Sequence, residues 1–110
     1  MSILKSTNSG INRPLTIQVL FDRNYYVDHA FEGSNYVIFK KKFDYIELEI
    51  LMSEHGRFFN YRFDKAIELN TVRQLIIIEN FYKNIQQGKK IVFSEAFDAV
   101  KKEFGVIYAI

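Results

Sequence analysis

Residues 36–63, which read YVIFKKKFDYIELEILMSEHGRFFNYRF, decide the fold. Three runs rich in aromatic and β-branched residues, 36–41, 45–52 and 58–63, are separated by short polar segments, which is typical of β-strands and their turns. Ser53-Glu54-His55-Gly56, between the last two runs, predicts a four-residue hairpin loop. Because every connection is short, we expect three antiparallel strands that are neighbours in the sheet.

Two more strands are expected before this stretch. Apolar residues alternate with others over 15–21, a period of two that predicts a half-buried strand. The run 25–31 predicts another strand, joined to the next by a type II′ turn centred on Gly33 and Ser34, because glycine supplies the positive φ that this turn needs.

The pattern becomes helical after Lys65. Thr71-Val72-Arg73-Gln74 matches a capping box and predicts a helix over 72–87, with Glu79 and Lys83 paired on its solvent side. Ser94 is expected to cap a second helix that ends at Gly105. The apolar residues 106–110 fit either a docked strand or the cut end of a longer domain. The prediction is an α+β fold, a five-stranded antiparallel β-meander followed by two α-helices packing on the sheet.

Length and composition limit the organisation of the chain. Its 110 residues suit a single domain, and we expect 1–13 to be a flexible N-terminal arm and 14–110 to be that α+β domain. There is no cysteine, so disulfides and cysteine-based zinc sites are excluded. The sequence has no secretory signal and no apolar run long enough to span a membrane, so a cytoplasmic protein is expected.

Charge pairing suggests a register for the sheet. If Lys40 faces Glu47 and Glu47 faces Arg62, opposite charges meet on neighbouring strands. This register sends to the helix-covered face Val37, Phe39, Ile46, Leu48, Ile50, Phe59, Tyr61 and Phe63. It leaves on the second face Tyr36, Ile38, Leu51 and Phe58.

The second face is therefore apolar too, and it must be covered. One interpretation is that the sheet twists enough for both patches to join a single core. The other is that Tyr36, Ile38, Leu51 and Phe58 bind a protein partner, either a second copy of the chain or a larger protein. The small size, the aromatic content and the absence of catalytic signatures are typical of an inhibitor or adaptor, such as a phage or mobile-element accessory protein.

A nucleic-acid binder is the alternative. Residues 57–63 alternate basic and aromatic residues, and sheets that bind RNA or single strands stack bases on such aromatics. The candidate contacts are Lys40, Lys42, Phe58 and Arg62. The segment lacks the glycines of the RNA-recognition strand signature, and a net charge of +2 is low for a dedicated nucleic-acid coater.

Signals for an enzyme are few. His29 and His55 lack the spacing that presents two imidazoles to one metal, and no phosphate-binding loop or nucleophile motif occurs. Glu47 and Glu49 lie about 7 Å apart on one strand face and could seat an acid and a base, but a charged ladder with Lys40 and Arg62 is the simpler interpretation. We expect no catalytic residue, no cofactor and no small-molecule substrate.

Overall fold

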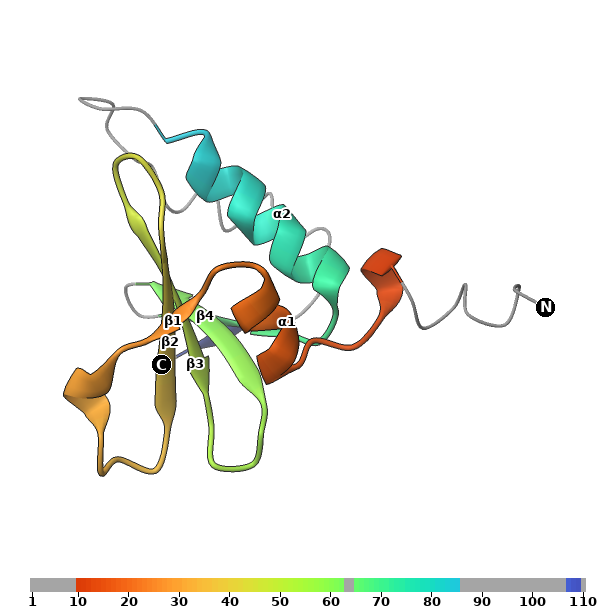
Figure 1. The fold of residues 1–110 in the computed structure, drawn as a ribbon. Helices are drawn as coiled ribbons and strands as arrows, with labels where there is room; N and C mark the ends of the chain where they lie inside the picture. Colours follow the sequence, from red (N-terminus) through yellow and green to blue (C-terminus); the bar gives the residue numbers. More distant parts are fainter. Residues whose placement is uncertain (1–9, 63–64, 86–106, 110) are drawn as a thin grey trace.

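A computed structural model describes residues 10–62, 65–85 and 107–109 (Figure 1). It describes the backbone alone at Phe31, Tyr61, Arg62, Lys65 and 107–109. Within these ranges, six strands form one antiparallel sheet, in the order in which they follow one another along the chain. They are β1 (Tyr26–Val27), β2 (Val37–Lys42), β3 (Glu47–Met52), β4 (Phe58–Arg62), β5 (Lys65–Leu69) and β6 (Ile107–Ala109). The helical elements are η2 (Gly10–Asn12), α1 (Ile17–Asp22), η3 (His29–Phe31) and α2 (Val72–Lys83). The predicted α+β class and the antiparallel sheet are confirmed, but β5 forms over 65–69, where the sequence pattern predicted no strand.

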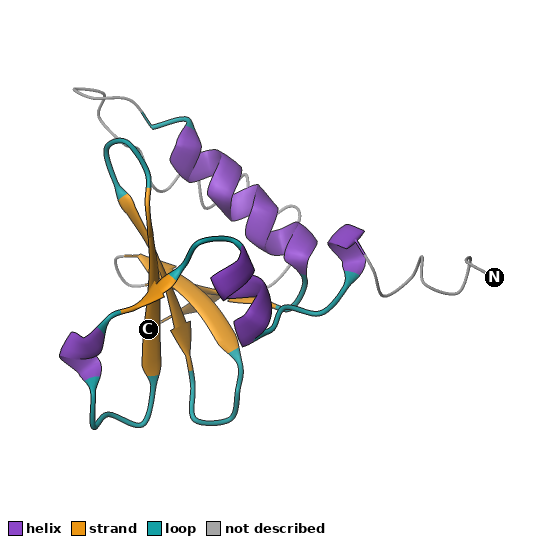
Figure 2. Ribbon diagram, in the orientation of Figure 1, coloured by secondary structure: helices purple, strands orange, loops and turns teal. Residues whose placement is uncertain are grey.

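Helices α1 and α2 pack against the same face of the sheet (Figure 2). One core cluster joins three sets of buried side chains: Leu15, Val19, Leu20 and Tyr25 in or beside α1; Phe39, Leu48, Ile50, Phe58, Ile67 and Leu69 of the sheet; and Val72, Leu75, Ile78 and Tyr82 of α2. Successive side chains of a strand point to opposite faces of the sheet, so the residues between these core positions lie on the other face. In the part of the chain that the structure describes, this cluster forms a core layer between the sheet and the helices α1 and α2.

The prediction of a strand over 15–21 is wrong, because most of this segment forms α1. The Thr16 hydroxyl accepts a hydrogen bond from the Val19 amide at 3.2 Å and caps the helix. Within α1 the buried residues are Val19 and Leu20, and Leu15, which precedes the cap, belongs to the same core cluster. Leu20 breaks the period of two, so the alternation on which the strand rested is incomplete.

The strand expected over 25–31 is much shorter than predicted. Only the two residues of β1 pair with β2, and η3 follows, capped by the Asp28 side chain, which accepts a hydrogen bond from the Ala30 amide at 3.0 Å. The connection to β2 is a loop over 28–36 and not a two-residue turn. Asp28 competes with the strand by offering its carboxylate to the backbone, a local preference typical of aspartate.

Strands β2 and β3 pair two residues away from the predicted register. Lys40 lies opposite Glu49, and Lys42 lies opposite Glu47. A shift of two residues keeps every side chain on its face, so the predicted faces of these two strands are correct.

Strands β3 and β4 differ from the prediction by one residue, and this exchanges the faces of β4. Met52 pairs with Phe58, so the loop spans 53–57 and includes Arg57, whose carbonyl accepts a hydrogen bond from the Ser53 amide at 2.8 Å. Glu47 therefore does not face Arg62, which pairs with Lys65 of β5. Phe58 moves to the helix-covered face, and Phe59 moves to the second face.

Helix α2 begins as predicted and ends earlier. The Thr71 hydroxyl accepts a hydrogen bond from the Gln74 backbone amide at 3.3 Å, and the Gln74 side chain accepts one from the Thr71 backbone amide. The predicted capping box is therefore confirmed. The helix ends at Lys83, four residues before the predicted end at 87. The second predicted helix lies outside the described residues, as does most of the predicted arm.

The first and the last described segments of the chain are both joined to the rest of the fold by backbone hydrogen bonds. β6 pairs with β5, so residues 107–109 form the docked strand that was one of the two expectations. Near the other end, the Leu15 amide donates to the Asn70 carbonyl at 2.9 Å, and Pro14 forms an isolated bridge with Thr71. No helix in the described ranges is long and apolar enough to cross a membrane.

Candidate protein-interaction surface

The second face of the sheet, turned away from α1 and α2, carries a short apolar row. Ile38 of β2 lies opposite Leu51 of β3, and Leu51 lies opposite Phe59 of β4. Ile38 is fully buried, whereas Leu51 and Phe59 are half-buried. We call these three residues the second-face row. Leu51 and Phe59 keep part of their apolar surface exposed on the side of the sheet that neither α1 nor α2 covers.

Ion pairs centred on Lys40 lie at the β2 end of this row. The Lys40 ammonium is 2.8 Å from the Asp28 carboxylate, 3.7 Å from that of Glu47 and 3.6 Å from that of Glu49. The hydrogen bond with Asp28 is the main reason why the pKa of Lys40 is raised above its ordinary value. Lys40 therefore stays protonated and is already matched by carboxylates of its own chain.

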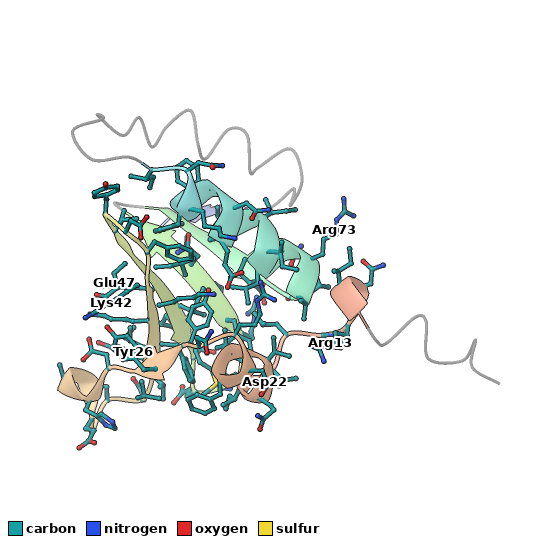
Figure 3. The ribbon with its side chains drawn as sticks, turned by 45° about the horizontal axis from the view of Figure 1, so that its top comes forward. Arg13, Asp22, Tyr26, Lys42, Glu47 and Arg73 are labelled. Atoms are coloured by element: carbon teal, nitrogen blue, oxygen red, sulfur yellow. The ribbon has the colours of Figure 1, made fainter. Side chains whose placement is uncertain are left out.

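Tyr26 extends this charged group toward the sheet edge. Its hydroxyl donates a hydrogen bond to Glu47, and the side chain is 42% exposed. Figure 3 shows Tyr26, Lys42 and Glu47 near one another on the same side of the molecule. Aromatic residues are enriched in protein interfaces, and the rim of such an interface is polar.

A second ion pair lies beside the β4 end of the row. The Arg57 guanidinium donates two hydrogen bonds to Glu68, at 2.9 and 2.7 Å, so the pair is bidentate. The same guanidinium lies 5.5 Å from the centre of the Phe59 ring, within cation–π distance. The apolar row is thus bounded at both ends by charges that are paired within the chain.

The predicted partner-binding residues are only partly together. Ile38 and Leu51 are register partners, and Tyr36 directly precedes β2. The placement of Phe58 with them is wrong: it lies in the core on the opposite face, 7% exposed, opposite Leu69. The reason is the five-residue loop before β4, which makes Phe59 the aromatic residue that joins Ile38 and Leu51.

The predicted nucleic-acid contacts do not form one surface. Phe58 is buried under the helices, and Lys40 is held by three carboxylates of the chain. Lys42 is exposed, and Arg62 is paired through its backbone with Lys65 rather than placed opposite Glu47. Lys40 and Phe58 lie on opposite faces, so the alternation of basic and aromatic residues along β4 does not produce a stacking platform with Lys40.

The histidines and the glutamate pair are surface groups. His29 contacts Glu32 at 2.8 Å and His55 contacts Glu54 at 3.5 Å, with all four side chains exposed. Glu47 and Glu49 both face Lys40, so the charged ladder is confirmed for Lys40, although Arg62 is not part of it as predicted. Within the described residues, no group of three or more histidine, aspartate or glutamate side chains is arranged to hold a metal ion.

Sequence reasoning missed a buried carboxylate on α2. Glu79 was expected on the solvent side with Lys83, but its side chain is 4% exposed. It accepts hydrogen bonds from Arg23, from the Tyr25 hydroxyl at 2.9 Å and from Lys41 at 3.3 Å. This cluster, the Glu79 cluster, ties the end of α1 and strand β2 to α2.

Protonation in the Glu79 cluster follows from burial and hydrogen bonding. Burial acts to raise the pKa of Glu79, but the hydrogen bonds from Arg23 and Tyr25 and the charge of Lys41 outweigh it, so the pKa is lowered. Burial, together with the neighbouring Glu79 charge, raises the pKa of Tyr25. The cluster therefore holds an ionised carboxylate beside a neutral phenol and two cations, which is a structural arrangement.

One signal in the sequence points to the Glu79 cluster. Leu75, Ile78, Glu79 and Tyr82 follow the spacing of one helix face. Glu79 thus lies within the apolar stripe of α2, where a carboxylate needs cationic partners. Its partners come from distant segments, so only the fold identifies them.

Comparison with known protein families, with curated proteins and with solved structures found no match to this chain.

Proposed function

We propose that the chain is a protein-binding module that uses the second-face row and its charged surroundings. The observation that supports this most is the position of Leu51 and Phe59. These two residues are register partners and are half-buried, and they lie on the sheet face that is turned away from α1 and α2. Apolar side chains at the centre of a surface with a polar rim are the usual anatomy of a protein interface.

The charges around the row favour a protein partner over nucleic acid. Lys40 is neutralised by Asp28, Glu47 and Glu49, and Arg57 is neutralised by Glu68. Affinity for nucleic acid depends largely on cations that are available to phosphates. A bidentate arginine stacked beside a phenylalanine, as in Arg57 and Phe59, suits a protein interface, where both residue types are enriched.

In this role the chain acts by occupying its partner, as an inhibitor or adaptor does, and the role needs no catalytic residue. The partner is a larger protein or a second copy of the chain. Light scattering on the purified chain distinguishes the two, because only self-association makes the mass rise with concentration.

Affinity capture with matched variants tests the proposal. The tagged wild-type chain, Leu51→Lys and Ile17→Lys are used to capture proteins from native cells, with and without nuclease. Ile17 is an exposed apolar residue of α1, 41% exposed, and serves as the control for adding a lysine. We expect the wild-type chain to capture a protein whether or not nuclease is present. The same protein should be captured by Ile17→Lys but not by Leu51→Lys. Capture that nuclease abolishes, or that Leu51→Lys leaves unchanged, would contradict the proposal.

The folded state of the variants must be shown separately. Urea unfolding of Leu51→Lys identifies any loss of stability, and the milder Leu51→Ala variant is used if the lysine unfolds the chain. A folded Leu51→Ala that captures the partner as well as the wild type does would count against the row as the binding site.

A further inference from the structure

A hollow of about 240 Å³ opens at the edge of the sheet, where β1 meets the loop over 28–36. Its lining residues are Val27, Asp28, Glu32, Gly33, Ser34, Tyr36 and Val37. Pockets for drug-sized ligands usually span about 300–1,000 Å³. The hollow is smaller than this range, so it suits one side chain of a partner better than a whole small molecule.

The lining combines apolar walls with negative charge. Val27, Tyr36 and Val37 supply apolar surface, and among the lining residues that the structure describes Asp28 and Glu32 are the charged ones. Lysine and arginine have a long apolar stem that ends in a charged head. Such a side chain can lay its stem against the walls while its head reaches a carboxylate.

Glu32 is the carboxylate best placed to take a new partner. Its contact with His29 joins two side chains that are about three-quarters exposed, 75% and 76%, and exposed ion pairs are weak. Asp28 is already engaged, because one oxygen accepts from the Ala30 amide and the other contacts Lys40 at 2.8 Å. A cationic head in the hollow therefore replaces the His29 contact of Glu32 and leaves the interactions of Asp28 in place.

We propose that this hollow receives a lysine or arginine side chain of the protein partner. The inference rests on the proposed function and specifies the chemistry of the partner. Tyr36 connects the two regions, because it lines the hollow and lies two residues before Ile38 of the second-face row. A partner that covers Leu51 and Phe59 would thus present a basic side chain toward the β1 edge.

Titration of the purified chain tests the hollow directly. The probes are the N-acetyl, N-methylamide derivatives of arginine, lysine, leucine and glutamate, added at millimolar concentrations while amide signals are followed by NMR. We expect arginine and lysine to give saturable shifts at Gly33, Ser34 and Val37. We expect no saturation with leucine or glutamate. Saturation with leucine or glutamate, or none with either basic probe, would overturn the proposal.

Two matched variants identify the carboxylate. Glu32→Gln should weaken binding of the arginine probe about fivefold or more, because a charge-assisted hydrogen bond is lost. Glu54→Gln is the control, since Glu54 also contacts a neighbouring histidine in an exposed turn but does not line the hollow. Equal affinity of the wild type and Glu32→Gln would overturn the role of Glu32.

Failure of this inference is separable from failure of the proposed function. If partner capture depends on Leu51 while the probes do not bind, the proposal that the hollow receives a basic side chain is wrong, and the proposed binding face is supported. If the probes bind through Glu32 while partner capture does not depend on Leu51, the proposal that the second face binds the partner is wrong.

Discussion

Phe58 and Phe59 are neighbours in β4 and have opposite environments. Phe58 is 7% exposed and belongs to the core cluster, whereas Phe59 is half-buried beside Arg57 on the second face. From the sequence alone the two were assigned the other way round. Aromatic residues occupy both faces of this strand, so hydrophobicity could not decide between them, and the length of the preceding loop did.

The two phenylalanines are expected to respond differently to truncation. Phe58→Ala should lower the free energy of unfolding by about 3–5 kcal/mol, because it empties a packed core position. Phe59→Ala should cost about 1 kcal/mol, a value typical of average substitutions. Urea unfolding of both variants measures the difference. A larger loss for Phe59→Ala than for Phe58→Ala would show that the faces of β4 are assigned wrongly.

The Glu79 cluster predicts an acid-sensitive contribution to stability. The pKa of Glu79 is lowered in the folded state, so the folded chain binds this proton less readily than the unfolded chain. The stabilisation is therefore complete above the unfolded pKa of about 4.3 and is lost as the pH falls through the lower folded pKa.

Glu79→Gln tests this contribution. The variant should lose about 3–5 kcal/mol at neutral pH, because Arg23 and Lys41 lose their buried counter-charge. Its urea midpoint should also fall less steeply on acidification than that of the wild type. Parallel pH profiles for the two proteins would contradict the assigned role of Glu79.

Among the elements, β2, β3, β4 and α2 were predictable and α1 was not. The long strands have apolar runs bounded by turns, and α2 has a capping box ahead of an apolar stripe, so local signals agree with the fold. Residues 15–21 carry two signals at once, a partial alternation of apolar residues and a threonine, Thr16, that caps a helix. Packing of α1 on the sheet decides between them, and that packing is not a local property.

The capping box of α2 can be tested at the scale of the element. Thr71→Ala removes the hydroxyl that accepts from the Gln74 amide and should cost about 1 kcal/mol. Asn80→Ala, at an exposed position of the same helix, is the control and should change stability by less than about 0.5 kcal/mol. Thermal unfolding of both variants checks the comparison. Equal stabilities would mean that the cap does not hold the start of α2.

At the scale of the whole molecule, the candidate surface was only partly predictable. Ile38 and Leu51 were placed correctly on the second face because a register shift of two residues preserves faces. Phe59 was missed because one additional loop residue reverses the faces of β4. The Glu79 cluster joins residues 23, 25, 41 and 79, and segments so far apart in sequence meet only in the folded chain.

The surface charges predict weak binding to nucleic acid. Lys40 and Arg57 are paired with carboxylates of the chain, and Phe58 is buried, so these three side chains are poorly available to phosphates or bases. Titration of a labelled single-stranded oligonucleotide at two salt concentrations measures this. We expect no micromolar binding at either concentration. Tight binding with a steep dependence on salt would favour the nucleic-acid alternative.

Photo-crosslinking from Phe59 tests the central claim, that the sheet face opposite α1 and α2 binds a protein. A benzophenone analogue of phenylalanine replaces Phe59 in one chain and Phe21 in another, because Phe21 is an exposed aromatic residue of α1, 46% exposed. After irradiation in native cells, we expect a protein adduct from position 59 and none from position 21. An adduct from position 21 alone, an adduct with nucleic acid, or no adduct from position 59 would contradict the claim.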